Sequence, residues 1–159
     1  MPDIVKKVPN AHLLITTTIE DENEKGNLIS LANVLGVEKH VTFLGFVSLE
    51  KLPQYYSLAN VLVQGSFSEK SGTTSMALPV KEAMCCETPA IRPDVGGNDV
   101  IDGESGYLVD PRDKSIMVEK IVLLLENDKL SQKMGRRARK YITKNYTWEN
   151  TAQIFLKNL

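Results

Sequence analysis

Short apolar segments rich in β-branched residues alternate with helical patterns along most of this 159-residue chain. The segments with the character of buried strands are residues 13–18, 41–44, 61–63, 90–91 and 106–109. Helical segments separate most of them, so the connections are crossovers, and a crossover joins parallel strands. The pattern therefore predicts an α/β fold: a mostly parallel sheet with helices on both faces, hence three layers, followed by C-terminal helices.

The helical segments have recognisable starts and stops. Helices are expected over residues 22–35, 49–58, a segment that ends near 86, 113–126, 130–146 and 148–159. Gly36 ends the first of these, because glycine readily adopts the left-handed conformation that follows a helix. Ser48 is expected to cap the second, with Pro53 in or near its first turn, where proline is tolerated.

The composition is that of an ordinary globular domain, with 42% hydrophobic and 25% charged residues. We expect one domain over residues 1–159 with a core that needs no disulfides. A net charge of −1 gives no general attraction to nucleic acid, and the basic run at 133–140 is interpreted as a solvated helix face, with nucleic-acid binding the less favoured alternative. No apolar run approaches the length of a membrane span, so none is expected.

Cysteine and histidine usage argues against thiol or metal chemistry. Cys85 and Cys86 are adjacent on a predicted helix and point in different directions, so no bridge is expected and a cytoplasmic location is favoured. With no histidine nearby, buried unreactive thiols are the better interpretation. His12 and His40 lie far apart without partners at ligand spacing, so no metal site is predicted.

Parallel sheets bind ligands beyond the carboxyl ends of their strands. The loop 64–74 follows such an end, is rich in small and hydroxyl residues, and opens a helix. Unpaired N–H groups at a helix start suit a phosphate, with Thr73 or Thr74 beside them. The alternative is a surface loop capped by one of these threonines, and the loop taken alone favours that alternative.

Two further features could face the same edge of the sheet. Glu82 follows that loop on a helix where Leu78, Val80 and Met84 are expected to pack inward; it is either a solvated carboxylate or an acceptor for a sugar or ribose diol, and neighbouring Lys81 is expected to point to solvent. The residues of the 94–99 turn include the pair Gly96 and Gly97. A glycine pair permits close backbone approach to a ligand, and the alternative is a tight loop capped by Asn98.

Several segments in order resemble the C-terminal, donor-binding domain of GT-B-fold glycosyltransferases of family 4, also called group 1. They are residues 8–15, 41–47, 52–61, 81–91, 95–97, 102–109 and 146–148. The stretch 81–91, for example, is similar to the family pattern L-E-A-M-A-x-G-x-P-V-I. The resemblance covers nearly the whole chain and implies one Rossmann-like half of a GT-B enzyme.

The resemblance also implies roles for individual residues. Glu82 would contact the ribose hydroxyls of a UDP- or GDP-sugar, and N–H groups around Ala77 and Leu78 would meet its diphosphate or sugar. The loop 45–47 would lie near the base. Its residues are Gly45, Phe46 and Val47. The implied reaction is hexosyl transfer with retained configuration, in which the leaving diphosphate is stabilised electrostatically and no metal or cofactor is required.

Two positions depart from the family pattern. Thr74 stands where the family has an acid eight residues before Glu82, and Ala77 stands where it has a glycine. Glu69 in the same loop is a candidate substitute for that acid. Glu69 and Thr74 are thus the candidate contacts to the donor sugar.

The resemblance further implies that the family's first strand, with an Arg/Lys pair for the diphosphate, and the N-terminal acceptor domain would precede Met1. We therefore expect a donor domain that lacks its first strand and does not catalyse alone. Its parent enzyme would be cytoplasmic and could reach the inner membrane face through the acceptor domain. The last helix resembles the segment that returns to that domain, so Phe155 and Leu156 are expected to be exposed. The alternative is a truncated or degenerate module that binds nucleotides or a partner without catalysis.

Overall fold

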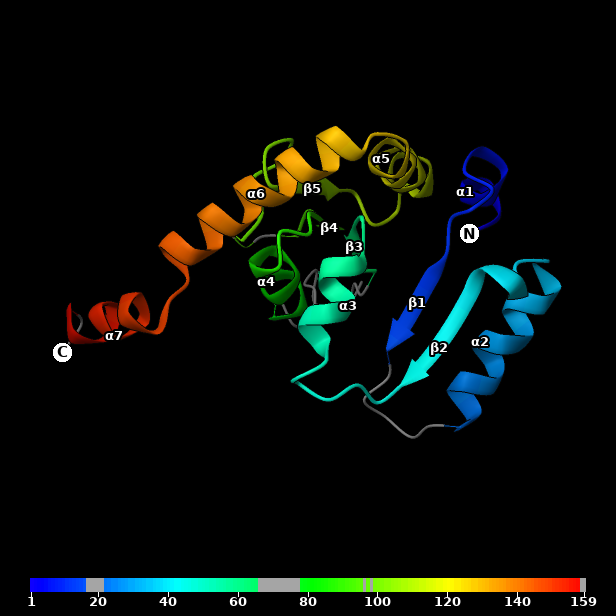
Figure 1. Cartoon of the computed structure of the whole chain (residues 1–159), viewed down its shortest axis with the longest axis horizontal. Coiled ribbons are helices and arrows are strands. Elements are labelled where there is room, and N and C mark those ends of the chain that lie inside the picture. Colours follow the sequence, from blue (N-terminus) through cyan, green and yellow to red (C-terminus); the bar gives the residue numbers. More distant parts are fainter. Residues whose placement is uncertain (17–21, 66–77, 96, 98, 158–159) are drawn as a thin grey trace. The chain divides into compact units, whose positions relative to one another are not determined.

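The computed structural model describes residues 1–16, 22–65, 78–95, 97 and 99–157 (Figure 1). The elements follow in the order α1 (Pro2–Lys7), β1 (Leu13–Thr16), α2 (Glu22–Val34), the 3-10 turn η1 (Glu38–His40), β2 (Val41–Gly45), α3 (Leu52–Leu58), β3 (Leu62–Val63), α4 (Leu78–Cys85), β4 (Ala90–Pro93), β5 (Gly106–Val109), α5 (Lys114–Glu126), α6 (Asp128–Asn145) and α7 (Trp148–Lys157). They form two compact units, Met1–Leu52 and Pro53–Leu159, which are described separately.

In the first unit, β1 and β2 pair in parallel, and α2 lies on the crossover between them. Both histidines tie this pair together. A ring nitrogen of His40 donates to the carbonyl of Ala11 (3.0 Å), and His12 is hydrogen-bonded to the hydroxyl of Thr42 (2.8 Å). The two histidines therefore have structural partners at the ends of the strands.

In the second unit, β3, β4 and β5 form a parallel sheet with β4 in the centre, where every residue is buried. Successive side chains of a strand point to opposite faces, and β4 contributes Ala90 to one core cluster and Ile91 to the other. Helix α4 packs into the first cluster, α5 into the second, and α6 into both. The predicted α/β class, with parallel strands and helices on both faces of a sheet, is confirmed for this unit.

The buried residues of each cluster come from elements far apart in the sequence. The first cluster contains Val80, Met84, Ala90, Val100, Ala138 and Ile142. The second contains Ile91, Val109, Leu124 and Met134. Met134, Ala138 and Ile142 recur at four-residue intervals along α6, so one stripe of this helix serves both clusters.

The start of α3 differs from the prediction. The helix begins at Leu52, and the residues after Ser48 form a turn in which the Ser48 carbonyl, not its side chain, accepts hydrogen bonds from the N–H groups of Lys51 (2.9 Å) and Leu52 (3.1 Å). Pro53 consequently occupies the second helical position. Proline lacks an N–H and has a helical φ, so it is well suited to the first turn and favours a helix that begins directly before it.

Residue Glu87 ends the α4 segment in the left-handed conformation, with φ of +63°. The left-handed conformation costs a residue with a Cβ atom about 1–2 kcal/mol, whereas glycine adopts it without that cost. We expect Glu87→Gly to raise the free energy of unfolding by about 1 kcal/mol, measured by urea denaturation, because the exposed side chain contributes little in return. Glu87→Ala is the matched control and should show no such gain; equal stabilities of the two variants would contradict the strain.

Candidate functional site

The carboxylate of Glu82 lies on α4, half-buried, and is held by a residue of α3. The hydroxyl of Tyr56 donates a hydrogen bond to Glu82 Oε2 over 2.9 Å. Burial, followed by the neighbouring Glu82 carboxylate, raises the pKa of Tyr56 well above its usual value. The phenol is therefore a neutral donor over the whole physiological range. Glu82 is thus a half-buried carboxylate with a side-chain hydrogen-bond partner, and not a freely solvated one.

The inward face of α4 is made by Val80, Ala83 and Met84, all fully buried. The expectation that Leu78 packs inward with them is wrong, because its side chain is 61% exposed. Residues four apart share one face of a helix, so Leu78 lies on the face of Glu82, whereas Val80 and Met84 share the opposite, buried face. Glu82 therefore lies one turn after Leu78, on a face of the helix that is not part of the core.

Lys81 does not extend freely into solvent as predicted. Its ammonium group lies 4.7 Å from the centre of the Tyr146 ring, a cation–π contact between α4 and the residue that follows α6. Burial, followed by the neighbouring Tyr141, raises the pKa of Tyr146 to about 12. This contact joins the α4 helix to the junction between α6 and α7.

A buried ion pair that the local sequence patterns did not reveal lies beside Gly97, after β4. Arg92, the third residue of β4, pairs with Asp99, and both side chains are at least 97% buried. Gly97 has φ of +95°, and a Cβ atom there would lie 2.9 Å from an Arg92 guanidinium nitrogen. The signal in the sequence is an arginine between two prolines in a strand, with an aspartate seven residues later. The positive φ and the nearby Arg92 side chain therefore both disfavour a residue with a Cβ atom at position 97.

The predicted contacts to the donor are only partly within the described chain. Glu69, Thr73, Thr74, Ala77 and Gly96 lie outside the described residues, as does Asn98, the predicted cap of the 94–99 turn, and their roles stay predictions. The loop after β2 is described: Gly45 has φ of +66°, Phe46 is 77% exposed and Val47 is half-buried. Cys85 and Cys86 are free and half-buried rather than buried, and burial raises the pKa of the Cys85 thiol, which opposes reactivity.

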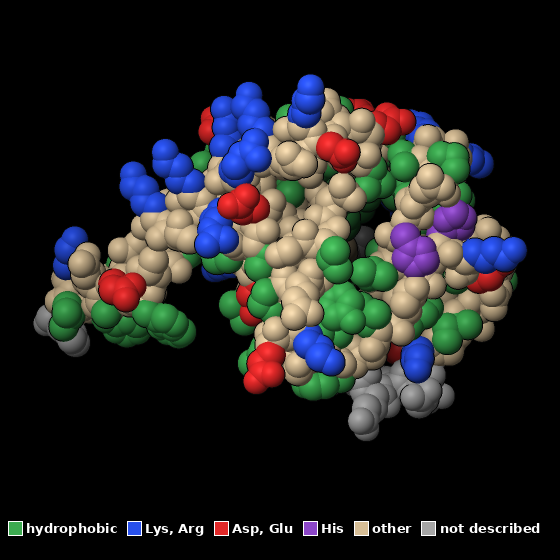
Figure 2. Space-filling model, in the orientation of Figure 1, with side chains coloured by type: hydrophobic (Ala, Val, Ile, Leu, Met, Phe, Trp, Pro, Cys, Tyr) green, Lys and Arg blue, Asp and Glu red, His purple; other side chains and the backbone are tan. Residues whose placement is uncertain are grey.

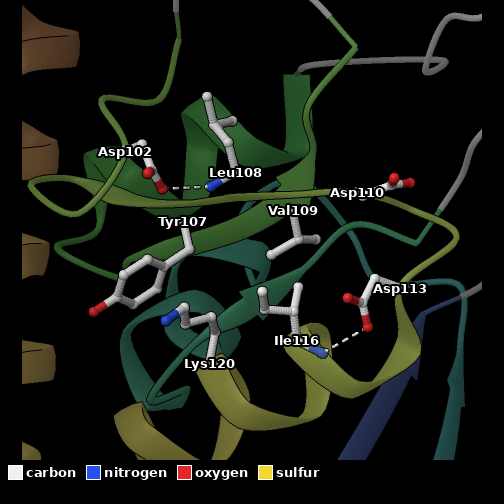
Figure 3. Close-up of a pocket in the computed structure, with 8 residues that line it drawn as sticks. All are labelled: Asp102, Tyr107, Leu108, Val109, Asp110, Asp113, Ile116 and Lys120. Carbon is white, nitrogen blue, oxygen red and sulfur yellow. Dashed lines mark hydrogen bonds between the residues drawn. The ribbon is translucent and has the colours of Figure 1, made fainter.

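A cavity of about 260 Å³ lies elsewhere, at the end of β5 and the start of α5 (Figure 3). Its carboxylates are already engaged with the backbone: Asp102 accepts from the N–H of Leu108 (2.9 Å), and Asp113 caps α5 by accepting from the N–H of Ile116 (3.1 Å). Hydrogen bonds from Ser115 and Ile116 lower the pKa of Asp113. None of the described donor contacts lines this cavity, which is therefore a structural feature of the β5–α5 turn.

The basic residues of α6 lie on its outer surface, as predicted, and Figure 2 shows Lys and Arg side chains along this helix. One of them, Arg139, donates to the carbonyl of Cys85 at the end of α4 (2.9 Å). Within the described ranges, no group of three or more His, Cys, Asp and Glu side chains could hold a metal ion. No helix among these residues is both long and apolar enough to cross a membrane.

This chain was compared with known families, proteins and solved structures, and it matches several of them. The sequence model of the family described as "Glycosyl transferases group 1" matches residues 1–141. D-inositol 3-phosphate glycosyltransferase of Corynebacterium efficiens is 33% identical over 125 residues, which cover 77% of this chain and 28% of that protein. Sucrose-phosphate synthase of Thermosynechococcus elongatus superposes with a TM-score of 0.81 at 27% identity, over 98% of this chain and 41% of that one.

A second solved structure, Anabaena Alr3699/HepE in complex with UDP, superposes with a TM-score of 0.82 at 19% identity, over 99% of this chain and 44% of that one. The fold thus matches part of each of these two solved structures. The chain belongs to the group 1 glycosyltransferase family. It spans less than half the length of the curated relatives it matches.

Proposed function

We propose that this chain is the nucleotide-sugar-binding half of a GT-B glycosyltransferase, with Glu82 as the acceptor for the ribose hydroxyls of the donor. The observation that carries the proposal is the half-buried Glu82 carboxylate on α4, held by Tyr56, in a chain of the group 1 family. A carboxylate forms charge-assisted hydrogen bonds to hydroxyl groups, which are about twice as strong as neutral ones. The UDP bound to the Anabaena relative supports a nucleotide ligand of this class.

The parent enzyme would transfer a hexose from a UDP- or GDP-sugar to an acceptor with retained configuration. The bond between the anomeric carbon and the diphosphate oxygen breaks, a bond to the acceptor oxygen forms on the same face of the sugar, and the proton of the acceptor hydroxyl passes to the departing diphosphate. Main-chain N–H groups near Leu78 would stabilise the charge of the departing diphosphate without a metal or cofactor. The loop of Gly45, Phe46 and Val47 would lie near the base, and the Gly96–Gly97 turn near the donor.

The parent enzyme would also need an acceptor-binding domain, because a donor domain supplies only one side of the cleft. Phe155 and Leu156 of α7 are 70% and 71% exposed, as predicted, and Trp148 is 87% exposed. These side chains support α7 as the segment that contacts the acceptor domain. We propose a cytoplasmic location for the parent enzyme, which a nucleotide-sugar donor would require and which the free Cys85 and Cys86 support.

A non-catalytic nucleotide-binding or interaction module is the second candidate. It is favoured by Thr74, which stands where the family pattern has an acid, and by Ala77, which replaces a glycine. Nucleotide affinity with no sugar transfer, after the chain is combined with an acceptor domain, would identify this candidate.

The proposal is tested by calorimetric titration of the chain with UDP and GDP. We expect weak binding of one of them, and Glu82→Ala should weaken it by about 10- to 100-fold, because a charged hydrogen-bond partner is lost. Glu119→Ala on α5 is the matched control, since it removes an exposed carboxylate and should leave affinity unchanged. Equal affinities of wild type and Glu82→Ala would contradict the assignment.

A further inference from the structure

We propose that Tyr56 is a positioning residue for nucleotide binding: its hydroxyl fixes the Glu82 carboxylate so that the second carboxylate oxygen meets the ribose hydroxyls. Tyr56 would thereby set the preference of the site for ribonucleotides over nucleotides without ribose hydroxyls. The inference rests on the proposed function and extends it to a residue outside α4.

The geometry joins two helices that are separate in the sequence. Tyr56 lies on α3, 26 residues before Glu82, and its hydroxyl reaches Glu82 Oε2 over 2.9 Å. Among the residues that the structure describes, this is the hydrogen bond that the Glu82 side chain accepts, so one carboxylate oxygen is committed to Tyr56 and Oε1 is left for other donors. A carboxylate accepts several hydrogen bonds, and each of its two oxygens can accept its own.

The main chain of Tyr56 is itself held in place. Its carbonyl accepts a hydrogen bond from the hydroxyl of Thr88, the buried residue two positions before β4 (2.6 Å), and another from the N–H of Ala59 (3.1 Å). The phenol ring has only two side-chain torsions, so its direction follows closely from the backbone. Two hydrogen bonds thus connect the segment before β4 to the Glu82 carboxylate: one joins Thr88 to the Tyr56 carbonyl, and the other joins the Tyr56 hydroxyl to Glu82.

Holding the carboxylate before the ligand arrives has a defined energetic effect. A glutamate loses side-chain freedom when it binds a ligand, and an existing hydrogen bond reduces that loss. The neutral phenol donates without adding charge, so the carboxylate stays a strong acceptor. A purely structural role for Tyr56 would instead affect every ligand of the site equally. The two roles therefore differ in their dependence on the ribose hydroxyls.

The test compares two ligands and two single variants by calorimetry. The ligands are whichever of UDP and GDP binds the wild type more tightly, and its 2′,3′-dideoxy analogue. Tyr56→Phe removes the hydroxyl and keeps the ring, and should weaken nucleotide binding by about three- to tenfold, the value of one hydrogen bond, while leaving affinity for the dideoxy analogue unchanged. Tyr55→Phe, at the adjacent half-buried tyrosine of the same helix, is the matched control and should change neither.

Coupling to Glu82 provides the second measurement. In the Glu82→Ala background, Tyr56→Phe should cause no further loss, because the residue that it positions is gone. An equal loss for both ligands, or a full loss in the Glu82→Ala background, would overturn the positioning role. Unchanged nucleotide affinity in Tyr56→Phe would overturn it too. A wild type that shows no preference for the nucleotide over its dideoxy analogue would instead overturn the proposed ribose contact, and with it the inference.

Discussion

Replacing Asp99 with alanine is expected to lower the free energy of unfolding by about 3–5 kcal/mol, the largest loss among the charged residues discussed above. Asp99 and Arg92 are almost completely buried, and the substitution leaves a guanidinium in the core without this carboxylate. Removing one partner of a buried pair is costly because the remaining charge keeps its desolvation penalty and loses its counter-ion. Urea denaturation followed by circular dichroism measures the change.

Two controls separate the effect of burial from that of charge. Glu119→Ala breaks the exposed pair with Lys120 and should change stability by less than about 1 kcal/mol, since surface pairs contribute little. A double substitution, Arg92→Met with Asp99→Leu, removes both charges and should recover much of the lost stability. If Asp99→Ala were no more destabilising than Glu119→Ala, the buried pair would not support the fold.

The second large effect is expected at Gly135, in the middle of α6. A Cβ atom at this position would lie 1.7 Å from the carbonyl oxygen of Glu87, far inside van der Waals contact, and the obstructing atom is backbone. Gly135→Ala must therefore move α6 away from the end of α4. We expect a loss of at least about 3 kcal/mol, the upper range for overpacked cores, measured by the urea midpoint.

A matched glycine on another helix provides the control. Gly26 lies within α2, and a Cβ atom there would meet nothing within 4 Å. Gly26→Ala should be neutral or stabilise by up to about 1 kcal/mol, because alanine is the better helix former. Destabilisation by both substitutions to the same extent would contradict the close approach of α6 to Glu87.

Much of the fold could be predicted from local pattern. The predicted strands at 41–44 and 106–109 match β2 and β5 closely, and the predicted helix at 113–126 matches α5 with Asp113 as its cap. These elements are specified by side-chain periodicity and by capping residues within a few positions. The start of α3 was predicted wrongly because the turn after Ser48 has the same polar composition as a helix cap, and both satisfy the following N–H groups.

The candidate site could be predicted only in part. Glu82 stands out because it lies on a helix that directly follows a loop suited to phosphate binding. This signal is local in the sequence. Its partner Tyr56 could not be found in this way, because nothing near position 56 marks a tyrosine as a hydrogen-bond donor to a residue 26 positions away. The contact of Lys81 with Tyr146 spans a still longer separation and was missed for the same reason.

The sequence by itself determined the order of strands and helices and, through the resemblance of its motifs to those of a known family, the family of the chain. The order of the elements depends on neighbours within a few residues, which periodicity records. The tertiary structure alone decided which polar groups meet: Tyr56 with Glu82, and Arg92 with Asp99. The physical reason is that hydrogen bonds and ion pairs between elements depend on how the crossovers pack, whereas the helical and strand periods fix only which face a side chain occupies.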